Sequence, residues 1–251
     1  MVAKRYGWIP DKPDPRDHPY EAPPNTVAQL PSTVDLRSRC PPVYNQGDLN
    51  SCTANAIAAA VQFDLMRQND AYFIPSRLFL YFNERSMAGN ANEDTGAPIR
   101  DGIKCIAKYG DCHEPLWPYV PSKFAEKPPS PCYGQARKYR AVEYQRLPQR
   151  SEQLRGCLAS GYPFVLGIKV YAEFEGSTAE KTGYVSMPAK NQKAKGGHAV
   201  LAVGYDDSKQ HFIVRNSWGD KWGINGYFML PYAYALDKTL ASDLWTIRVI
   251  T

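Results

Sequence analysis

The sequence contains no run of about 18 apolar residues, so no segment of its 251 residues is long and apolar enough to span a membrane. Its beginning, Met1–Trp8, lacks the apolar centre of a signal peptide. Export by another route, a leader outside this sequence and retention in the cell all stay open. The sequence therefore assigns no compartment.

Patterns of metal ligands are also missing. The six cysteines form no CxxC pair or other zinc-ligand spacing, and the chain has only four histidines. We therefore expect no metal site. The net charge of +5 comes from basic residues spread along the chain, with the densest stretch at 190–195. No nucleic-acid-binding motif accompanies that stretch, so we expect a solvated loop there and no nucleic-acid partner.

Proline is plentiful at the beginning of the chain. Residues 1–29 contain six prolines, which fix φ and remove backbone donors, so we predict an extended arm without a helix or a central strand. The main domain is then 30–251, a length that suits one domain with two lobes. The arm is either a short pro-segment or a static wrap on the surface.

The apolar pattern changes its period along the chain. Helical periodicity predicts helices near 52–68, 76–86, 97–109 and 151–160. Asn50 or Ser51 would cap the first of these helices, and Ser151 the last. Enrichment in β-branched and aromatic residues predicts strands at 163–170, 198–205, 211–215, 227–230 and 244–250. A helical half, mainly 40–140, before a strand-rich half, mainly 141–245, indicates an α+β fold with segregated lobes.

Cys52 stands where the first long helix is predicted to begin. The positive end of a helix dipole favours a thiolate there, which makes Cys52 a candidate nucleophile. Gln46 lies six residues upstream, and its side-chain amide is a candidate donor to an oxyanion. Many buried cysteines begin helices, so this pattern needs a base before it indicates catalysis.

The base must come from the four histidines. We expect His18, His113 and His211 at the surface, because they lie in the arm or in turns. His198 differs, since it begins an apolar strand after two glycines that let the backbone approach another group closely. It is the candidate general base.

Asn216 supplies a candidate orienting group for this base. It ends the strand that follows His198, and residues 206–209 between the two strands form a predicted hairpin turn. Asn216 would therefore lie beside His198 and fix the tautomer of its imidazole. Trp218 would cover that hydrogen bond and exclude water.

Three blocks together resemble the papain family of cysteine peptidases. They are Gln46-Gly47 with Ser51-Cys52, then Gly197-His198-Ala199-Val200, then the stretch 216–227. They occur in the family's order, and His198 follows Cys52 by 146 positions, inside the window of about 130–150 typical of papain itself. The resemblance covers about 30–251. It implies a papain-like two-lobed fold, in which a helical lobe with the Cys52 helix at its centre packs against an antiparallel β-barrel-like lobe, with the active site in the cleft between them.

The resemblance also implies an activity. The chain would be a cysteine endopeptidase that acts on proteins or peptides through a thiolate–imidazolium pair and a thioester acyl-enzyme. Cys52, His198, Asn216 and Gln46 would be its catalytic residues. The implied substrate-binding residues are Gly96, Thr95, Gly197, Trp218 and Ser242. The implied reaction requires no metal and no organic cofactor. We expect a monomer.

This sequence departs from the family's pattern at several positions. Leu49 replaces a cysteine usually found three residues before the nucleophile, and Thr53 replaces an aromatic residue after it. Of a glycine pair in the cleft wall, only Gly96 remains. Asp243 is either near the floor of the substrate pocket or a solvated turn residue.

The other cysteines leave an odd number if Cys52 is a free nucleophile. We expect Cys105 and Cys157 to be small buried residues of helices, and Cys112–Cys132 is the disulfide that we favour.

Two alternative functions stay open. One is acyl transfer or transpeptidation on the same thiol. The other is a catalytically silent binding protein, which is disfavoured because all four catalytic residue types are present. The arm is expected either to occupy the cleft and lower activity, or to wrap around the strand-rich lobe.

Overall fold

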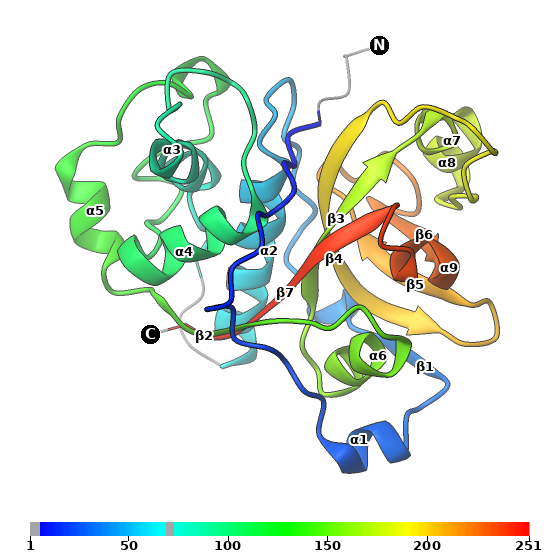
Figure 1. Ribbon diagram of the computed structural model, residues 1–251. Helices are drawn as coiled ribbons and strands as arrows, with labels where there is room; N and C mark the ends of the chain where they lie inside the picture. The colour runs from blue at the N-terminus through cyan, green and yellow to red at the C-terminus, as the bar shows by residue number, and fades with distance from the viewer. Residues whose placement is uncertain (1–5, 69–72, 251) are drawn as a thin grey trace.

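The computed structural model describes residues 6–68 and 73–250. The helices of residues 52–136 gather on one side of an antiparallel sheet, the other helices lie beside the strands, and the N-terminal segment runs between the first group and the sheet (Figure 1). The main helices are α1 (Pro24–Ala28), α2 (Cys52–Arg67), α3 (Arg77–Met87), α4 (Ile99–Tyr109), α5 (Ser130–Ala136), α6 (Ser151–Ala159), α7 (Ala172–Glu175), α8 (Ser177–Thr182) and α9 (Tyr232–Leu236), with short 3-10 helices at Arg37–Arg39 and Pro121–Lys123. The strands are β1 (Thr33–Asp35), β2 (Ala141–Arg146), β3 (Phe164–Val170), β4 (Gly196–Asp206), β5 (His211–Arg215), β6 (Tyr227–Pro231) and β7 (Ala241–Ile250).

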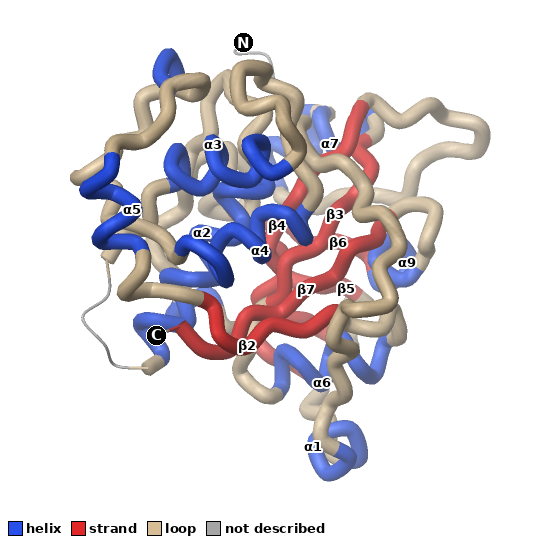
Figure 2. The backbone as a smooth tube through the Cα atoms, turned by 60° about the vertical axis from the view of Figure 1, so that its left-hand side comes forward, coloured by secondary structure: helices blue, strands red, loops and turns tan. Residues whose placement is uncertain are grey.

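The helix that carries Cys52 is central, as the sequence predicts. Every residue of α2 from Cys52 to Leu65 is buried. Its alanines keep the helix thin, so β4 and β7 pack against it on one side and α3 and α4 on the other. Figure 2 shows these helices grouped against the strands. The thiol is thereby fixed at the boundary between the helices and the sheet.

The sheet confirms the antiparallel lobe but not its barrel-like shape. Within the described part of the chain the strands form an open path, β2-β7-β3-β4-β5-β6, with β1 added beside β4. The pairing of β4 with β5 ends at Asp206 opposite His211, which is the predicted hairpin. His198 near the start of β4 pairs with Ile168 of β3, and the pairing of β4 with β5 begins three residues later, at Leu201 opposite Arg215.

Several local predictions are wrong for identifiable reasons. The arm contains the helix α1, because a proline in the first turn of a helix loses no hydrogen bond and presets φ. Ser151 is the first residue of α6, and the N-cap is Arg150. Ser51 does occupy the N-cap of α2, but its hydroxyl pairs with the Tyr119 hydroxyl, 2.6 Å away, and makes no capping bond. None of the helices in the described ranges is long and apolar enough to cross a membrane.

The predicted Cys112–Cys132 disulfide is also wrong. All six cysteines are free thiols, and the side chains of Cys112 and Cys132 form a hydrogen bond to each other. Burial and the neighbouring Asp111 raise the pKa of the Cys112 thiol, so it stays protonated, and a protonated thiol is a poor nucleophile for disulfide exchange. Cys105 and Cys157 are buried in α4 and α6, as expected.

Candidate active site

Cys52 is the first residue of α2, and its side chain is fully buried. The thiol Sγ accepts a hydrogen bond from the backbone N–H of Ala199, 3.3 Å away, which is the residue after His198. The backbone N–H of Gly7 in the arm also donates to it. The nucleophile candidate is therefore held between the two lobes, with the arm against its sulfur.

The imidazole of His198 is oriented by Asn216. His198 Nε2 lies 2.8 Å from Asn216 Oδ1, and the same oxygen accepts from the backbone N–H of Ser217 at 2.8 Å. Because this atom accepts from a backbone donor, it is the amide oxygen, and Nε2 must carry the proton. The lone pair is then on Nδ1, a buried atom without a hydrogen-bond partner among the described residues. Nδ1 is the atom left for proton transfer.

Trp218 stacks on the imidazole. The two ring centroids are 4.9 Å apart and the ring planes differ by 26°. Trp218 follows Asn216 by two residues, so the turn after β5 delivers both the orienting amide and the cover. This keeps water from the His198–Asn216 hydrogen bond.

Gln46 joins the loop before α2 to the turn after β5. Its backbone N–H donates to Ser217 O at 2.9 Å, and its side-chain Oε1 accepts from Ser217 Oγ at 2.6 Å. The amide Nε2 donates to Leu49 O at 2.8 Å. Both ends of the amide are thus fixed, which orients a donor group beside the nucleophile. Leu49, where relatives carry a cysteine, is buried and contributes its carbonyl to this arrangement.

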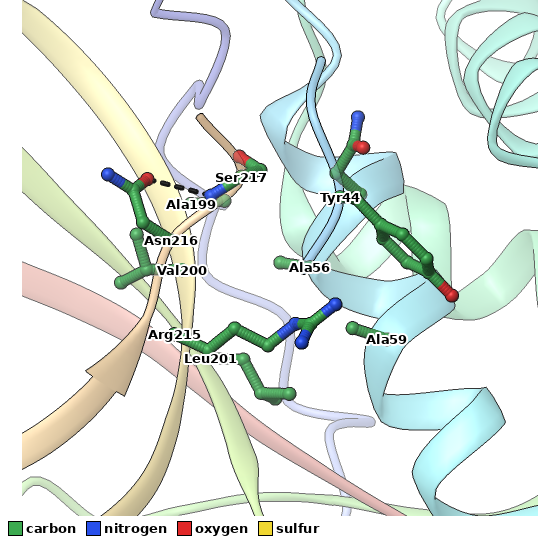
Figure 3. A pocket seen from close by; sticks show the side chains of 10 residues that line it. Tyr44, Ala56, Ala59, Ala199, Val200, Leu201, Arg215, Asn216 and Ser217 are labelled. Atoms are coloured by element: carbon green, nitrogen blue, oxygen red, sulfur yellow. Dashed lines mark hydrogen bonds between the residues drawn. The ribbon is translucent and has the colours of Figure 1, made fainter. Parts of the chain in front are cut away.

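A small space lies behind these residues. Between α2 and the β4–β5 hairpin there is a cavity of about 10 Å³, lined by side chains that include Ala56, Ala59 and Arg215 (Figure 3). Arg215 donates to the carbonyls of Pro41 and Pro42, both at 2.5 Å. A space of this size has room for about one water, so it is a packing feature between the lobes.

The arm runs between the α2–α4 helices and the sheet (Figure 1), and its backbone bonds to both sides. The N–H of Trp8 donates to Gly197 O at 2.9 Å, on the strand side. On the helix side, the N–H of Ala97 donates to Gly7 O at 2.8 Å, and the N–H of Ile9 donates to Ala97 O at 3.1 Å. These contacts use backbone groups on both walls. Farther along, the N–H of Tyr20 donates to Arg146 O at 2.8 Å, so the later arm lies along β2.

The approach of the arm is so close that it requires glycine at Gly7 and Gly96. A Cβ on Gly7 would stand 1.6 Å from Asn50 O. A Cβ on Gly96 would stand 1.9 Å from Gly7 O, and the backbone φ of Gly96 is 76°. The retained glycine of the cleft wall thus faces the one glycine of the arm.

Two aromatic side chains of the arm lie on either side of Gly7. The Tyr6 ring packs edge-on against His198 and Trp218, with centroids 6.2 Å and 6.1 Å apart, and its hydroxyl donates to Glu175. Trp8 is 6% exposed, and its indole N–H donates to Asp243 Oδ2 at 3.2 Å. Sequence reasoning named neither residue, since a proline-rich segment carries no signal for what it packs against.

Asp243 is not a solvated turn residue, which corrects one of the two readings of it. It is 2% exposed, with a φ of 56°. It accepts hydrogen bonds from Trp8, from the N–H of Asp11 at 2.7 Å, and from Arg146 at 3.0 Å. Burial, with the nearby Asp11 carboxylate, raises the pKa of Asp243 to about 6. The arm therefore covers a buried carboxylate.

The other predicted substrate-binding residues differ in placement. Gly197 and Trp218 both contact the arm, as described above. Ser242 is half-buried in β7 and pairs with Gly167 of β3. Thr95 is exposed, and its hydroxyl accepts from the Asn90 side chain at 2.8 Å and donates to Gly96 O at 3.4 Å.

Burial shifts the pKa values of both Cys52 and His198. It raises the pKa of the Cys52 thiol to about 11, against the lowering effect of the Ala199 and Gly7 N–H groups. It lowers the pKa of His198 to about 4, opposed by the bond to Asn216. Both shifts favour the neutral thiol and neutral imidazole. The structure therefore favours the neutral pair over the thiolate–imidazolium pair that the resemblance implies.

Thr53, where relatives carry an aromatic residue, has a specific partner. Its hydroxyl donates to Glu84 Oε1 at 2.6 Å, and Glu84 is fully buried in α3. Burial raises the pKa of Glu84 to about 8, so this carboxyl is protonated at neutral pH. The pair anchors the first turn of α2 to α3.

Among the described residues no group of three or more histidine, cysteine, aspartate or glutamate side chains could hold a metal ion.

The arrangement of thiol, oriented imidazole and fixed amide defines a class of enzyme, the hydrolases that use cysteine as the nucleophile. Residues 30–241 match the sequence model of the papain family of cysteine proteases. The chain belongs to this family.

Its relatives extend the match to the whole length. The crystal structure of xylellain, a cysteine protease from Xylella fastidiosa, is 43% identical and superposes with a TM-score of 0.92 over 100% of both chains. An uncharacterized peptidase C1-like protein of Acanthamoeba polyphaga mimivirus is 40% identical over 100% of this chain and 88% of its own. A digestive procathepsin L 3 of Tenebrio molitor shares the fold at 22% identity, with a TM-score of 0.72 over 99% of this chain and 77% of that one.

Proposed function

We propose that this protein is a cysteine endopeptidase made in a latent form, in which its own N-terminal arm closes the cleft. The observation that carries the proposal is the arm backbone, which contacts both walls of the cleft and donates to the nucleophile sulfur from Gly7. A peptide substrate needs the same space. The papain family match supports the hydrolase activity, and the arm contacts support the latency.

The reaction follows from the residues at hand once the arm has left. Exposure to water removes the burial that holds Cys52 and His198 neutral, so the thiol proton passes to His198 Nδ1. The thiolate attacks the peptide carbonyl, and the Gln46 side-chain amide and Cys52 backbone N–H hold the oxyanion. His198 protonates the leaving amine and then activates the water that hydrolyses the thioester, while Asn216 keeps the imidazole in its tautomer.

The direction of the arm makes it a poor substrate for its own site. His198 gives its proton to the leaving amine, so the C-terminal part of a substrate lies beside His198 and Trp218. In the arm that place belongs to Tyr6, which precedes Gly7 in the chain. The arm thus runs opposite to a substrate, and no peptide nitrogen of the arm is placed as a leaving group next to the imidazole.

Gly7→Ala tests the latency in the full-length chain. The added Cβ would overlap Asn50 O, so the arm must leave the cleft, and we expect faster hydrolysis of a fluorogenic dipeptide amide. Gly134→Ala is the matched control, because a Cβ there meets nothing within 4 Å. An unchanged kcat/KM in a folded Gly7→Ala protein contradicts the latency.

Labelling tests the nucleophile separately. A thiol-directed epoxide should label Gly7→Ala faster than the native chain and should leave Gly7→Ala combined with Cys52→Ala unlabelled. If the open protein is labelled at Cys52 but releases no product from any peptide, it is a silent binding protein. Product analysis with an added amine separates hydrolysis from transpeptidation, since only the acceptor of the thioester differs.

A further inference from the structure

The hydroxyl of Tyr119 lies between the two parts of the chain that supply the oxyanion donors. The loop 45–51 carries Gln46, and Cys52 begins α2 directly after this loop. Tyr119, in the segment between α4 and α5, donates from its hydroxyl to Gln46 O, 2.8 Å away. The same hydroxyl lies 2.6 Å from Ser51 Oγ. One side chain thus contacts the residue with the side-chain donor and the residue whose peptide bond carries the Cys52 N–H.

The protons of this arrangement have a fixed direction. Gln46 O is a carbonyl oxygen and can only accept, so the Tyr119 hydroxyl donates to it and accepts from Ser51 Oγ. Ser51 Oγ in turn accepts from the side-chain N–H of Asn55 at 3.1 Å, one turn farther into α2. Burial raises the pKa of Tyr119, so its hydroxyl keeps its proton. The hydrogen bonds form one chain that runs from α2 to Gln46.

Arg77 of α3 fixes the ring of Tyr119. The guanidinium carbon of Arg77 lies 4.1 Å from the centroid of the Tyr119 ring and 4.7 Å from that of the Tyr44 ring. A cation over an aromatic face is attracted by the ring. The Glu114 carboxylate holds the same guanidinium through two hydrogen bonds of 2.6 Å and 2.8 Å. The position of the Tyr119 hydroxyl is therefore set by the helical lobe.

Gln46 is held from the strand side as well. Its backbone N–H and its side-chain Oε1 both bond to Ser217, which follows β5. The bond from Tyr119 is an opposing attachment, to the lobe that carries Cys52. Ser51 uses its hydroxyl in this chain and makes no capping bond, although a cap typically contributes about 1 kcal/mol. The sequence has thus given up a helix cap for a bond that ties the loop to the helix.

We propose that Tyr119 is a positioning residue of the reaction, which holds the Gln46 amide at the separation from the Cys52 N–H at which both donors reach one oxyanion. This inference rests on the proposed peptidase function. Oxyanion donors act over a narrow range, at about 2.7–3.1 Å from the oxygen. A displacement of about 1 Å can cost about a hundredfold in rate. A loop that shifts when the hydroxyl is lost should therefore lower kcat.

Tyr119→Phe removes only the hydroxyl. In the Gly7→Ala background we expect kcat for the fluorogenic dipeptide amide to fall about tenfold, a part of the factor of about 10²–10³ that is lost with a whole donor. KM and the rate of epoxide labelling of Cys52 should stay unchanged, because attack on an epoxide creates no oxyanion on a carbonyl. Tyr133→Phe is the matched control. Its hydroxyl donates to Asn83 Oδ1 at 2.9 Å within the helical lobe, and its loss should change none of the three values.

A double-mutant cycle separates positioning from a general loosening of the fold. With Gln46→Ala present the loop has no side-chain donor to place, so Tyr119→Phe should then change kcat little. Equal factors in both backgrounds overturn the inference, and so does an unchanged kcat or a labelling rate that falls together with kcat. Ser51→Ala cuts the same chain at its helix end. It should also lower kcat without slowing labelling, and an unchanged kcat in this variant overturns the inference too.

Failure of the peptidase function gives a different result. If Gly7→Ala cleaves no peptide, that function fails, and a peptide aldehyde decides the inference instead. The Cys52 sulfur adds to the aldehyde carbon, the thiol proton passes to the carbonyl oxygen, and this oxygen takes the place of the oxyanion. About tenfold weaker protection of Cys52 from labelling in Tyr119→Phe supports the role of Tyr119. Equal protection in both proteins, or none in either, overturns it.

Discussion

Trp8→Ala is the most direct measure of how strongly the arm holds the cleft closed. The indole is 6% exposed and its N–H is bonded to Asp243, so closing the arm buries nearly the whole side chain. Truncation of a buried tryptophan to alanine costs about 3–5 kcal/mol. The lower end of this range corresponds to about a hundredfold shift of the closed-to-open equilibrium.

The assay is the rate of epoxide labelling of Cys52 in the full-length chain. With the arm opening and closing faster than Cys52 is labelled, the rate should rise by about a hundredfold in Trp8→Ala, or until the arm is fully open. Ile9→Ala is the matched control, because this neighbouring arm side chain is 39% exposed and loses little on truncation. Trp8→Phe should lie between the two, since it keeps most of the ring and loses the N–H. Equal rates for Trp8→Ala and the native chain would refute the reasoning that the indole anchors the arm.

Two further predictions concern the core of the site. Gln46→Ala in the Gly7→Ala background should lower kcat by a factor of about 10²–10³, because an oxyanion donor is lost. Epoxide labelling of Cys52 should persist in this variant. An unchanged kcat would remove Gln46 from the mechanism. Glu84→Gln keeps an acceptor for Thr53 and removes an ionisation. The pKa of Glu84 is raised in the fold to about 8 from 4.5, so its contribution to stability is full below pH 4.5 and is lost as the pH rises through about 8. The unfolding free energy of the native protein should fall over this pH range by up to about 1.4 kcal/mol per pH unit, and that of Glu84→Gln should change less. Identical denaturant curves of the native protein at pH 5 and pH 8 would contradict this. Glu126→Gln is the control, because Glu126 is exposed.

The reacting residues are readable in the sequence because each belongs to a regular element. Cys52 begins an alanine-rich helix, and His198 and Asn216 are brought together by a hairpin whose turn and strand periods are local signals. The antiparallel lobe follows from the same patterns. β1 and β2 were missed, since their pairing with β4 and β7 joins segments far apart in the chain and leaves no local period.

The protonation of the site and the path of the arm are decided by tertiary structure alone. Burial raises the pKa of the Cys52 thiol, and the Ala199 and Gly7 N–H groups that donate to its sulfur come from distant parts of the chain. The sequence determines that the arm is extended, because proline fixes φ. It does not determine where the arm lies, because the contacts of Gly7 with Asn50 and of Trp8 with Asp243 join distant parts of the chain. Such contacts depend on shape and on unsatisfied buried groups, which exist only after the two lobes have packed.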